Sequence, residues 1–154
     1  MKKLGYLLSS ALLLSILFTI GCKKDGGDET PEYELRLQEM ATTWTATDVQ
    51  LDGDNVTDGF SGFTLTVTNA YGYSASGATR SPQPWPASGT WDFDGAGTDN
   101  VNINKVIRDD GLEISIDAIS ESSLILSFNF VEGTHDSGRT EAVSGNWTFT
   151  FAAQ

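Results

Sequence analysis

The sequence contains only one cysteine, Cys22, and only one histidine, His135. A single thiol excludes an intramolecular disulfide, and a single imidazole leaves a zinc site short of ligands. A Ser-His-Asp triad would depend on His135, but the stretch EGTHDSG around it is typical of a water-exposed turn, which holds no imidazole in fixed geometry. Nothing in the spacing of the carboxylates singles out a glycosidase pair. We therefore expect neither an enzyme nor a cofactor.

Basic side chains are also scarce. Lysine and arginine together number 9 against 21 aspartates and glutamates, so the formal net charge is -12 at pH 7. A surface this acidic repels phosphate backbones and anionic lipid headgroups, which excludes a nucleic-acid partner. Any attachment to a membrane must then come from an anchor. The acidity has two interpretations. It either keeps an exported protein soluble or forms a surface that binds a cationic partner.

Long apolar runs are absent except at the N-terminus. Lys2 and Lys3 precede LGYLLSSALLLSILFTIG, which has the charged and hydrophobic regions of a secretory signal. This run is close to the lower limit for a membrane-spanning helix, so an uncleaved anchor is the alternative. The stretch Thr19-Ile20-Gly21-Cys22 resembles the bacterial lipobox, in which a small residue precedes the cysteine that is lipidated. The resemblance implies a signal peptide at residues 1–21 and a lipid on Cys22, the new N-terminus.

A flexible tether is expected at residues 22–34, because KKDGGDE after the cysteine is charged and glycine-containing and buries no surface. Lysines and acids directly after the cysteine resemble lipoproteins of Bacteroidota, in which an acidic motif near this position directs export to the outer face of the outer membrane. The resemblance implies a lipid-anchored outer-membrane protein. Gly26 and Gly27 interrupt the acids, which leaves open the face on which the protein lies.

One short helix is expected to begin near the end of this stretch. Thr30-Pro31-Glu32 offers a hydroxyl cap, a proline in the first turn and an acid at the positive end of the helix dipole. The apolar positions at helical spacing that follow are Tyr33, Leu37, Met40 and Ala41. We expect a helix of about ten residues. From residue 42 onward the apolar residues recur at every second position, which indicates strands.

Eight stretches show this alternation. Five are clear, at residues 63–68, 90–94, 112–117, 124–130 and 146–151, and three are weaker, at residues 44–51, 71–75 and 101–107. Short antiparallel strands with one apolar face each can close into an up-and-down barrel or pack as two sheets. We expect closure, because it removes exposed edges and the connections are short. The fold class is therefore all-β, an eight-stranded antiparallel barrel over residues 35–154 with a short N-terminal helix.

Glycine-aromatic patterns in four stretches carry a family resemblance. The stretches are ATTW at residues 41–44, FSGFTL at 60–65, WPASGTWDF at 85–93 and VSGNWTF at 143–149. Together they resemble the lipocalin-like domains of small Bacteroidota lipoproteins, although Thr42 stands where lipocalins usually have glycine. The resemblance implies a ligand-binding barrel and names no ligand.

Three tryptophans, Trp44, Trp91 and Trp147, lie on the apolar faces of the expected strands. Large rings at such positions usually fill the core, and the alternative is that they line a cavity. In either case we expect them in the barrel interior.

Three further aromatic residues, Tyr71, Tyr73 and Trp85, lie beside the proline-bracketed stretch SPQPWP. We expect the backbone of this connection to be exposed at the mouth of the barrel. Exposed tyrosine and tryptophan rings stack on sugars or on apolar ligands. The hypothesis is therefore that these three residues contact the ligand.

Two acidic turns raise the question of calcium, which prefers several oxygen ligands in a tight loop. Residues 92–100 contain Asp92, Asp94 and Asp99, and residues 52–58 are a looser version. Neither has the bidentate glutamate of an EF-hand, and aspartate, asparagine and glycine are also common in ordinary hairpin turns. We expect no metal site, with calcium at the three aspartates left open.

Two functions remain. The first is a monomeric, lipid-anchored binding protein for a small hydrophobic molecule or a glycan. The second is a protein-interaction or envelope-structural module without a small ligand, for example an inhibitor of a cationic partner.

Overall fold

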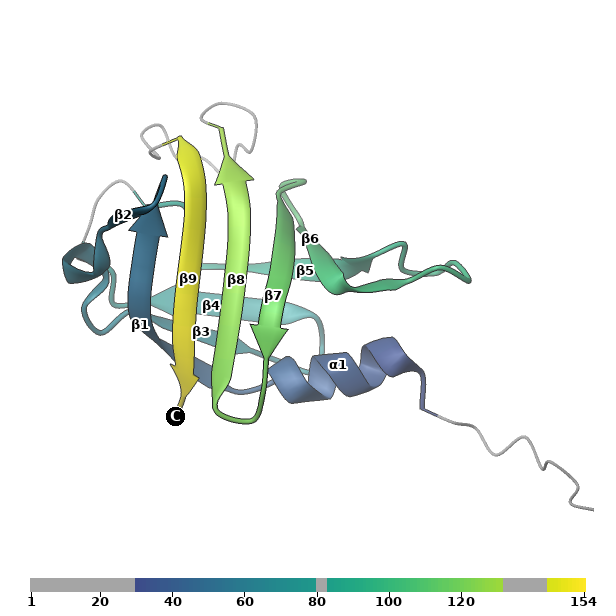
Figure 1. Ribbon diagram of the computed structural model, residues 1–154. Helices are drawn as coiled ribbons and strands as arrows, with labels where there is room; N and C mark the ends of the chain where they lie inside the picture. The colour runs from purple at the N-terminus through teal and green to yellow at the C-terminus, as the bar shows by residue number, and fades with distance from the viewer. Residues whose placement is uncertain (1–29, 80–82, 132–143) are drawn as a thin grey trace, which may run out of the picture.

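The computed structural model describes residues 30–79, 83–131 and 144–154. Within them lie one α-helix, α1 (Glu32–Met40), one 3-10 turn, η1 (Thr57–Phe60), and the strands of a single sheet (Figure 1). The strands are β1 (Thr43–Leu51), β2 (Asp54–Asn55), β3 (Thr64–Val67), β4 (Gly72–Ser76), β5 (Ser88–Asp94), β6 (Asn102–Arg108), β7 (Glu113–Ile119), β8 (Ser123–Phe130) and β9 (Gly145–Ala153). The expected signal peptide, Cys22 and His135 lie outside the described residues.

The sheet closes into an antiparallel barrel. From β3 to β9 each strand pairs with the next along the chain, and β1 pairs with both β3 and β9, which completes a ring of eight strands. The short strand β2 only forms a hairpin with β1. The predicted eight-stranded barrel is confirmed, and β2 is an addition that alternation could not indicate because both of its residues are exposed.

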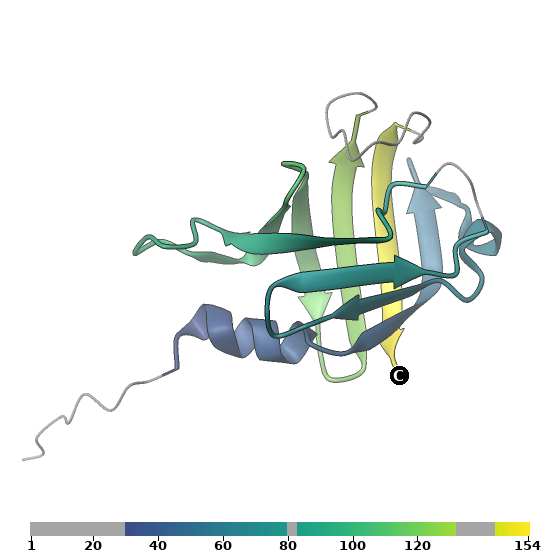
Figure 2. The same cartoon turned by 180° about the vertical axis from the view of Figure 1, so that it is seen from behind.

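The two ends of the barrel differ. The helix end carries α1, the β3–β4 turn, the β5–β6 loop and the β7–β8 turn, whereas the far end carries the β4–β5 connection and the β6–β7 turn (Figures 1 and 2). Helix α1 lies beneath the β5–β6 hairpin, which extends beyond the rest of the barrel. Elements from four separate parts of the chain therefore lie at the helix end.

Helix α1 has 9 residues, close to the expected length. Its N-cap is Pro31, and no side chain caps it, so the expected hydroxyl cap from Thr30 does not form. Leu37 and Met40 are buried, and the Met40 carbonyl accepts a hydrogen bond of 2.8 Å from Nε1 of Trp44. This bond ties the end of α1 to the start of β1. Within the described part of the chain, no helix combines the length and the apolar character needed to cross a membrane.

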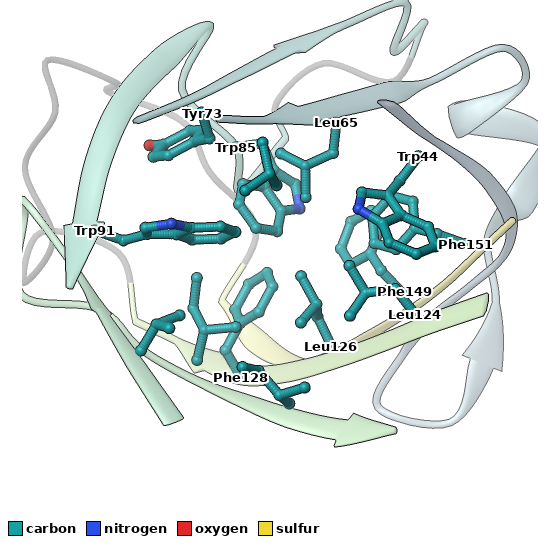
Figure 3. Close-up of a cluster of buried hydrophobic side chains, with 14 of the residues drawn as sticks. Trp44, Leu65, Tyr73, Trp85, Trp91, Leu124, Leu126, Phe128, Phe149 and Phe151 are labelled. Atoms are coloured by element: carbon teal, nitrogen blue, oxygen red, sulfur yellow. The ribbon is translucent and has the colours of Figure 1, made fainter. Parts of the chain in front are cut away.

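The barrel interior is dominated by aromatic rings (Figure 3). The ring of Phe149 stacks on those of Phe128 and Phe151, with centroids 5.9 and 5.8 Å apart. Phe60, supplied by η1, packs edge-on against Phe149 at 5.2 Å. The inward residues of the five clear strands are all buried, which confirms the faces predicted from alternation. Close ring packing of this kind stabilises a core beyond its buried area.

Candidate functional site

Two of the three expected ligand contacts, Tyr73 and Trp85, lie inside the barrel. Their side chains are only 3% and 0% exposed, so the expectation of exposed rings at the barrel mouth is wrong for both. The β4–β5 connection folds inward at the far end and buries Pro84 and Pro86 as well. Figure 3 shows Trp85 in the middle of the ring cluster, and its ring lies 5.8, 5.6 and 5.9 Å from those of Tyr73, Phe128 and Phe149.

A buried arginine holds this inward fold. Arg108, at the end of β6, is 2% exposed, and its guanidinium carbon lies 5.8 Å from the centroid of the Trp85 ring. It donates a hydrogen bond of 3.0 Å to the carbonyl of Pro84, and its Nε donates one of 2.9 Å to Asp110. Asp110 also accepts a hydrogen bond from the backbone N–H of Leu112. The sequence alone did not indicate this pair, because Arg108 and Asp110 belong to the stretch RDDG, whose composition is typical of a solvated turn.

The tryptophans expected in the interior are there. Trp44, Trp91 and Trp147 are 0%, 3% and 0% exposed, as predicted. Trp91 contacts Tyr73 with ring centroids 5.6 Å apart, and Trp147 stacks on Phe149 at 5.8 Å. With Trp85 added from the connection, these rings favour core filling over the lining of a ligand cavity.

Tyr71 lies at the opposite end from Trp85. It precedes β4 in the β3–β4 turn, is half-buried and has a φ of 58°, in the left-handed region. The hydroxyl of Thr68 accepts hydrogen bonds from the backbone N–H groups of Ala70 and Gly72, and the Tyr71 carbonyl accepts one of 2.9 Å from the N–H of Trp91. The turn is thus fixed on both sides of Tyr71. The three sequence candidates are therefore not brought together, and only Tyr71 remains accessible.

Two hollows flank Tyr71. One, of about 180 Å³, is lined by Tyr33 of α1, Tyr71 and Asp92 of β5, and is completed by residues of the β5–β6 loop. The other, of about 410 Å³, has Tyr71 beside Glu34, Leu37, Gln38 and Asn69. We call the two hollows together the Tyr71 groove. It presents two phenol rings, two carboxylates and two amides to a ligand.

The electrostatics of the groove are negative. The pKa of the Tyr71 hydroxyl is raised above its ordinary value of 10.0, first by burial and then by the nearby Asp92, Tyr33 and Glu34. These surroundings disfavour a phenolate, so Tyr71 stays neutral at physiological pH and can donate a hydrogen bond. The carboxylates of Asp92 and Glu34, and not the burial, favour a ligand that carries positive charge.

Two other hollows lack an accessible aromatic ring. One, of about 580 Å³, lies on the outer face of β6 to β9 beside the ion pair between Lys105 and Glu113, whose atoms are 2.9 Å apart. Phe128 and Trp147 border it, but their rings are buried in the barrel. The other, of about 680 Å³, lies between α1 and the β7–β8 turn. Neither hollow offers the stacking surface that Tyr33 and Tyr71 provide.

The acidic turns show no arrangement for a metal. Among the described residues, no group of three or more histidine, cysteine, aspartate or glutamate side chains could hold a metal ion, and this includes Asp92, Asp94 and Asp99. The β5–β6 loop is instead held by Thr98, whose hydroxyl donates to the Gly95 carbonyl at 2.7 Å. In the second turn, Asp52 accepts a hydrogen bond of 2.8 Å from the backbone of β9. The polar residues of both turns therefore form hydrogen bonds that hold the backbone in place.

Comparison with protein-family models, with curated proteins and with solved structures finds no match for this chain. The geometry of the Tyr71 groove is therefore the basis on which a function can be assigned.

Proposed function

We propose that this chain is a lipid-anchored lipoprotein of the outer membrane whose lipocalin-like barrel binds a small ligand in the Tyr71 groove, outside its interior. One observation carries the proposal: Trp85 occupies the middle of the barrel, whereas Tyr71 lines two hollows on the surface. Ligand-binding barrels of this size usually hold their ligand inside. In this chain the ring cluster occupies that place.

The side chains of the groove suit a small polar ligand with one apolar face. Tyr33 and Tyr71 provide ring surface, and Gln38 and Asn69 provide amide donors and acceptors. Pockets that combine rings with a few placed polar groups are typical of specific small-molecule recognition. A glycan or another polar ligand fits this description better than a purely apolar molecule, because the carboxylates of Glu34 and Asp92 would lose water to an apolar surface without compensation.

The proposed anchor would hold the groove close to the membrane. Between Cys22 and the first residue of α1, Glu32, the chain can span at most about 35 Å when fully extended. The groove lies beside α1, so its ligand would be met within this distance of the lipid surface.

Native mass spectrometry of the full-length lipoprotein, purified from its own host in a non-ionic detergent, tests the proposal. We expect a small molecule to accompany the wild-type protein and to be lost from Tyr71→Ala. The matched control is Trp85→Phe, which alters a ring in the interior and should retain the ligand. Retention in Tyr71→Ala together with loss in Trp85→Phe would place the ligand inside the barrel and contradict the proposal.

A protein-interaction module is the second candidate, and one observation favours it. The basic side chains of the described residues are Arg36, Lys105 and Arg108, and each is ion-paired with a carboxylate of this chain. The far more numerous acidic side chains therefore leave a negative surface that a basic protein would match. Capture of a basic envelope protein at low salt and its release at high salt, with no small molecule bound, would support this candidate.

A further inference from the structure

We infer that the Tyr71 groove is a binding site for an organic amine, with the ammonium group lying between the rings of Tyr33 and Tyr71 and the carboxylate of Asp92. The inference rests on the proposed function, because it names the class of ligand that the same groove would take. Three elements supply the three side chains: α1, the β3–β4 turn and β5. Their meeting depends on the closed barrel and on the position of α1 beneath the β5–β6 hairpin (Figures 1 and 2).

The smaller hollow of the groove, beside Tyr33 and Asp92, has a size that suits a charged head group. Its volume is about 180 Å³, below the range of about 300 to 1,000 Å³ that is typical of pockets for whole drug-sized ligands. Ala96, Gly97 and Val101 complete its lining, and none of them carries a charge. The neighbouring hollow of about 410 Å³ also contacts Tyr71 and offers room for the remainder of the ligand.

The chemistry of the lining favours a cation. The face of a tyrosine ring attracts an ammonium group, and pairs of aromatic rings are a common way to bind alkylated amines. Asp92 adds a full negative charge, and its Oδ1 is held by a hydrogen bond of 2.8 Å from the N–H of Phe93. Among the described residues, no lysine or arginine lines either hollow, and neither Asp92 nor Glu34 forms an ion pair.

The local potential agrees with this chemistry. Asp92, Tyr33 and Glu34 contribute to the raised pKa of the Tyr71 hydroxyl, because they disfavour a further negative charge beside them. A positive charge at the same place is stabilised by the carboxylates of Asp92 and Glu34. Phosphate, sulfate and carboxylate ligands would be repelled. A neutral sugar could stack on the rings but would leave the negative charge of Asp92 unused.

The backbone of Tyr71 also points to a role for its ring. A φ of 58° is uncommon for a bulky side chain, and glycine or asparagine adopts it at lower cost. Glycine is present at the next position, Gly72, and asparagine two positions earlier, Asn69. The turn thus has residues suited to the left-handed conformation nearby, yet it places tyrosine there and directs it to the groove.

Saturation-transfer difference NMR with choline and 3,3-dimethylbutan-1-ol tests the inference on the full-length lipoprotein in a non-ionic detergent. The two probes have nearly the same shape, but only choline is charged. We expect choline to bind about tenfold more tightly than the neutral alcohol. Asp92→Asn should weaken choline binding about tenfold and Tyr71→Ala should abolish it, whereas Tyr71→Phe, which keeps the ring, should retain it. The matched control is Asp58→Asn, an exposed acid at the far end, which should leave binding unchanged.

Phosphocholine distinguishes the two sources of such an amine. Binding as tight as that of choline indicates a lipid headgroup, and much weaker binding indicates a soluble amine without an adjacent phosphate. Circular dichroism of each variant verifies that the barrel is intact.

Equal binding of choline and the neutral alcohol, or no effect of Asp92→Asn, would overturn the inference while the proposed function stands. Failure of choline to bind would also overturn it, and the ligand detected by native mass spectrometry would still test the groove independently. Loss of that ligand from Tyr71→Ala would support the proposed function even when choline does not bind.

Discussion

At Tyr71, the conformation of the backbone and the accessibility of the ring both depart from what alternation along a strand predicts. The residue adopts a φ of 58° directly before β4, while the hydroxyl of Thr68 organises the turn through the N–H groups of Ala70 and Gly72. A left-handed conformation destabilises a non-glycine residue by about 1 to 2 kcal/mol. If the Tyr71 ring only stabilised the fold, glycine or asparagine, which adopt this backbone conformation at lower cost, would be expected to stabilise it at least as well.

Tyr71→Asn should therefore leave the free energy of unfolding unchanged to within about 1 kcal/mol, because the relieved backbone offsets the lost contacts of a half-buried ring. Urea denaturation measures this difference. The matched control is Tyr73→Asn, at a position that is 3% exposed, where loss of the buried ring should cost about 3 to 5 kcal/mol. Equal destabilisation by the two substitutions would mean that the Tyr71 ring is structural.

At the scale of elements, the β6–β7 turn holds the β4–β5 connection inside the barrel. Arg108 links the two, since it bonds to the carbonyl of Pro84, lies over the ring of Trp85 and pairs with Asp110. The Arg108 and Asp110 side chains are 0% and 5% exposed. A buried ion pair contributes little compared with apolar residues of the same shape, but breaking it leaves an uncompensated buried charge.

Asp110→Asn should accordingly destabilise the fold by about 3 to 5 kcal/mol, because the guanidinium of Arg108 would stay buried without its counter-charge. Thermal unfolding followed by circular dichroism should show a lower midpoint than for the wild type. The corresponding change on the outer face is Glu113→Gln, which removes the exposed partner of Lys105 and should have no measurable effect. If Asp110→Asn were as stable as the wild type, the pair would not hold the connection.

At the scale of the whole molecule, the closed barrel and the acidic surface are both compatible with the proposed lipid anchor. Closure leaves eight strands without an open edge apart from the short β2 hairpin, which protects a sheet protein from edge-to-edge aggregation. The net charge of -12 opposes adhesion to anionic lipid, so the proposed membrane attachment would depend on acyl chains. The helix end, with the Tyr71 groove, adjoins the expected tether, and residues 32–34 of that stretch form the start of α1.

Cys22→Ala should move the protein from the membrane fraction to the soluble fraction, because the acyl chains supply its affinity for the bilayer. Fractionation with immunoblotting detects the shift, and intact-mass measurement of the wild type should show the added acyl mass. Gly26→Ala, in the tether, is the matched control and should remain with the membrane. Persistence of Cys22→Ala in the membrane would indicate an uncleaved signal anchor instead.

Most of the fold follows from local rules. Side chains on a strand alternate between two faces, so the burial of Leu124, Leu126 and Phe128 and of their counterparts on other strands could be predicted from the spacing alone. The stretch around Trp85 could not be predicted in this way. It has the composition of an exposed loop, but proline has no N–H, so a Pro-Trp-Pro segment brings few donors into the core that need partners. Arg108 supplies a partner for the Pro84 carbonyl.

The sequence by itself determined that the chain after residue 42 supplies strands with one apolar face and that Trp44, Trp91 and Trp147 lie on those faces, because a period of two is a property of each strand alone. Only the tertiary structure decided which aromatic residues stay accessible. Trp85 became core because the far end of the barrel could enclose it beside Arg108, and Tyr71 became a surface residue because closure placed it between α1 and β5. Contacts between residues that lie far apart along the chain depend on how the barrel closes, and no local sequence pattern predicts that closure.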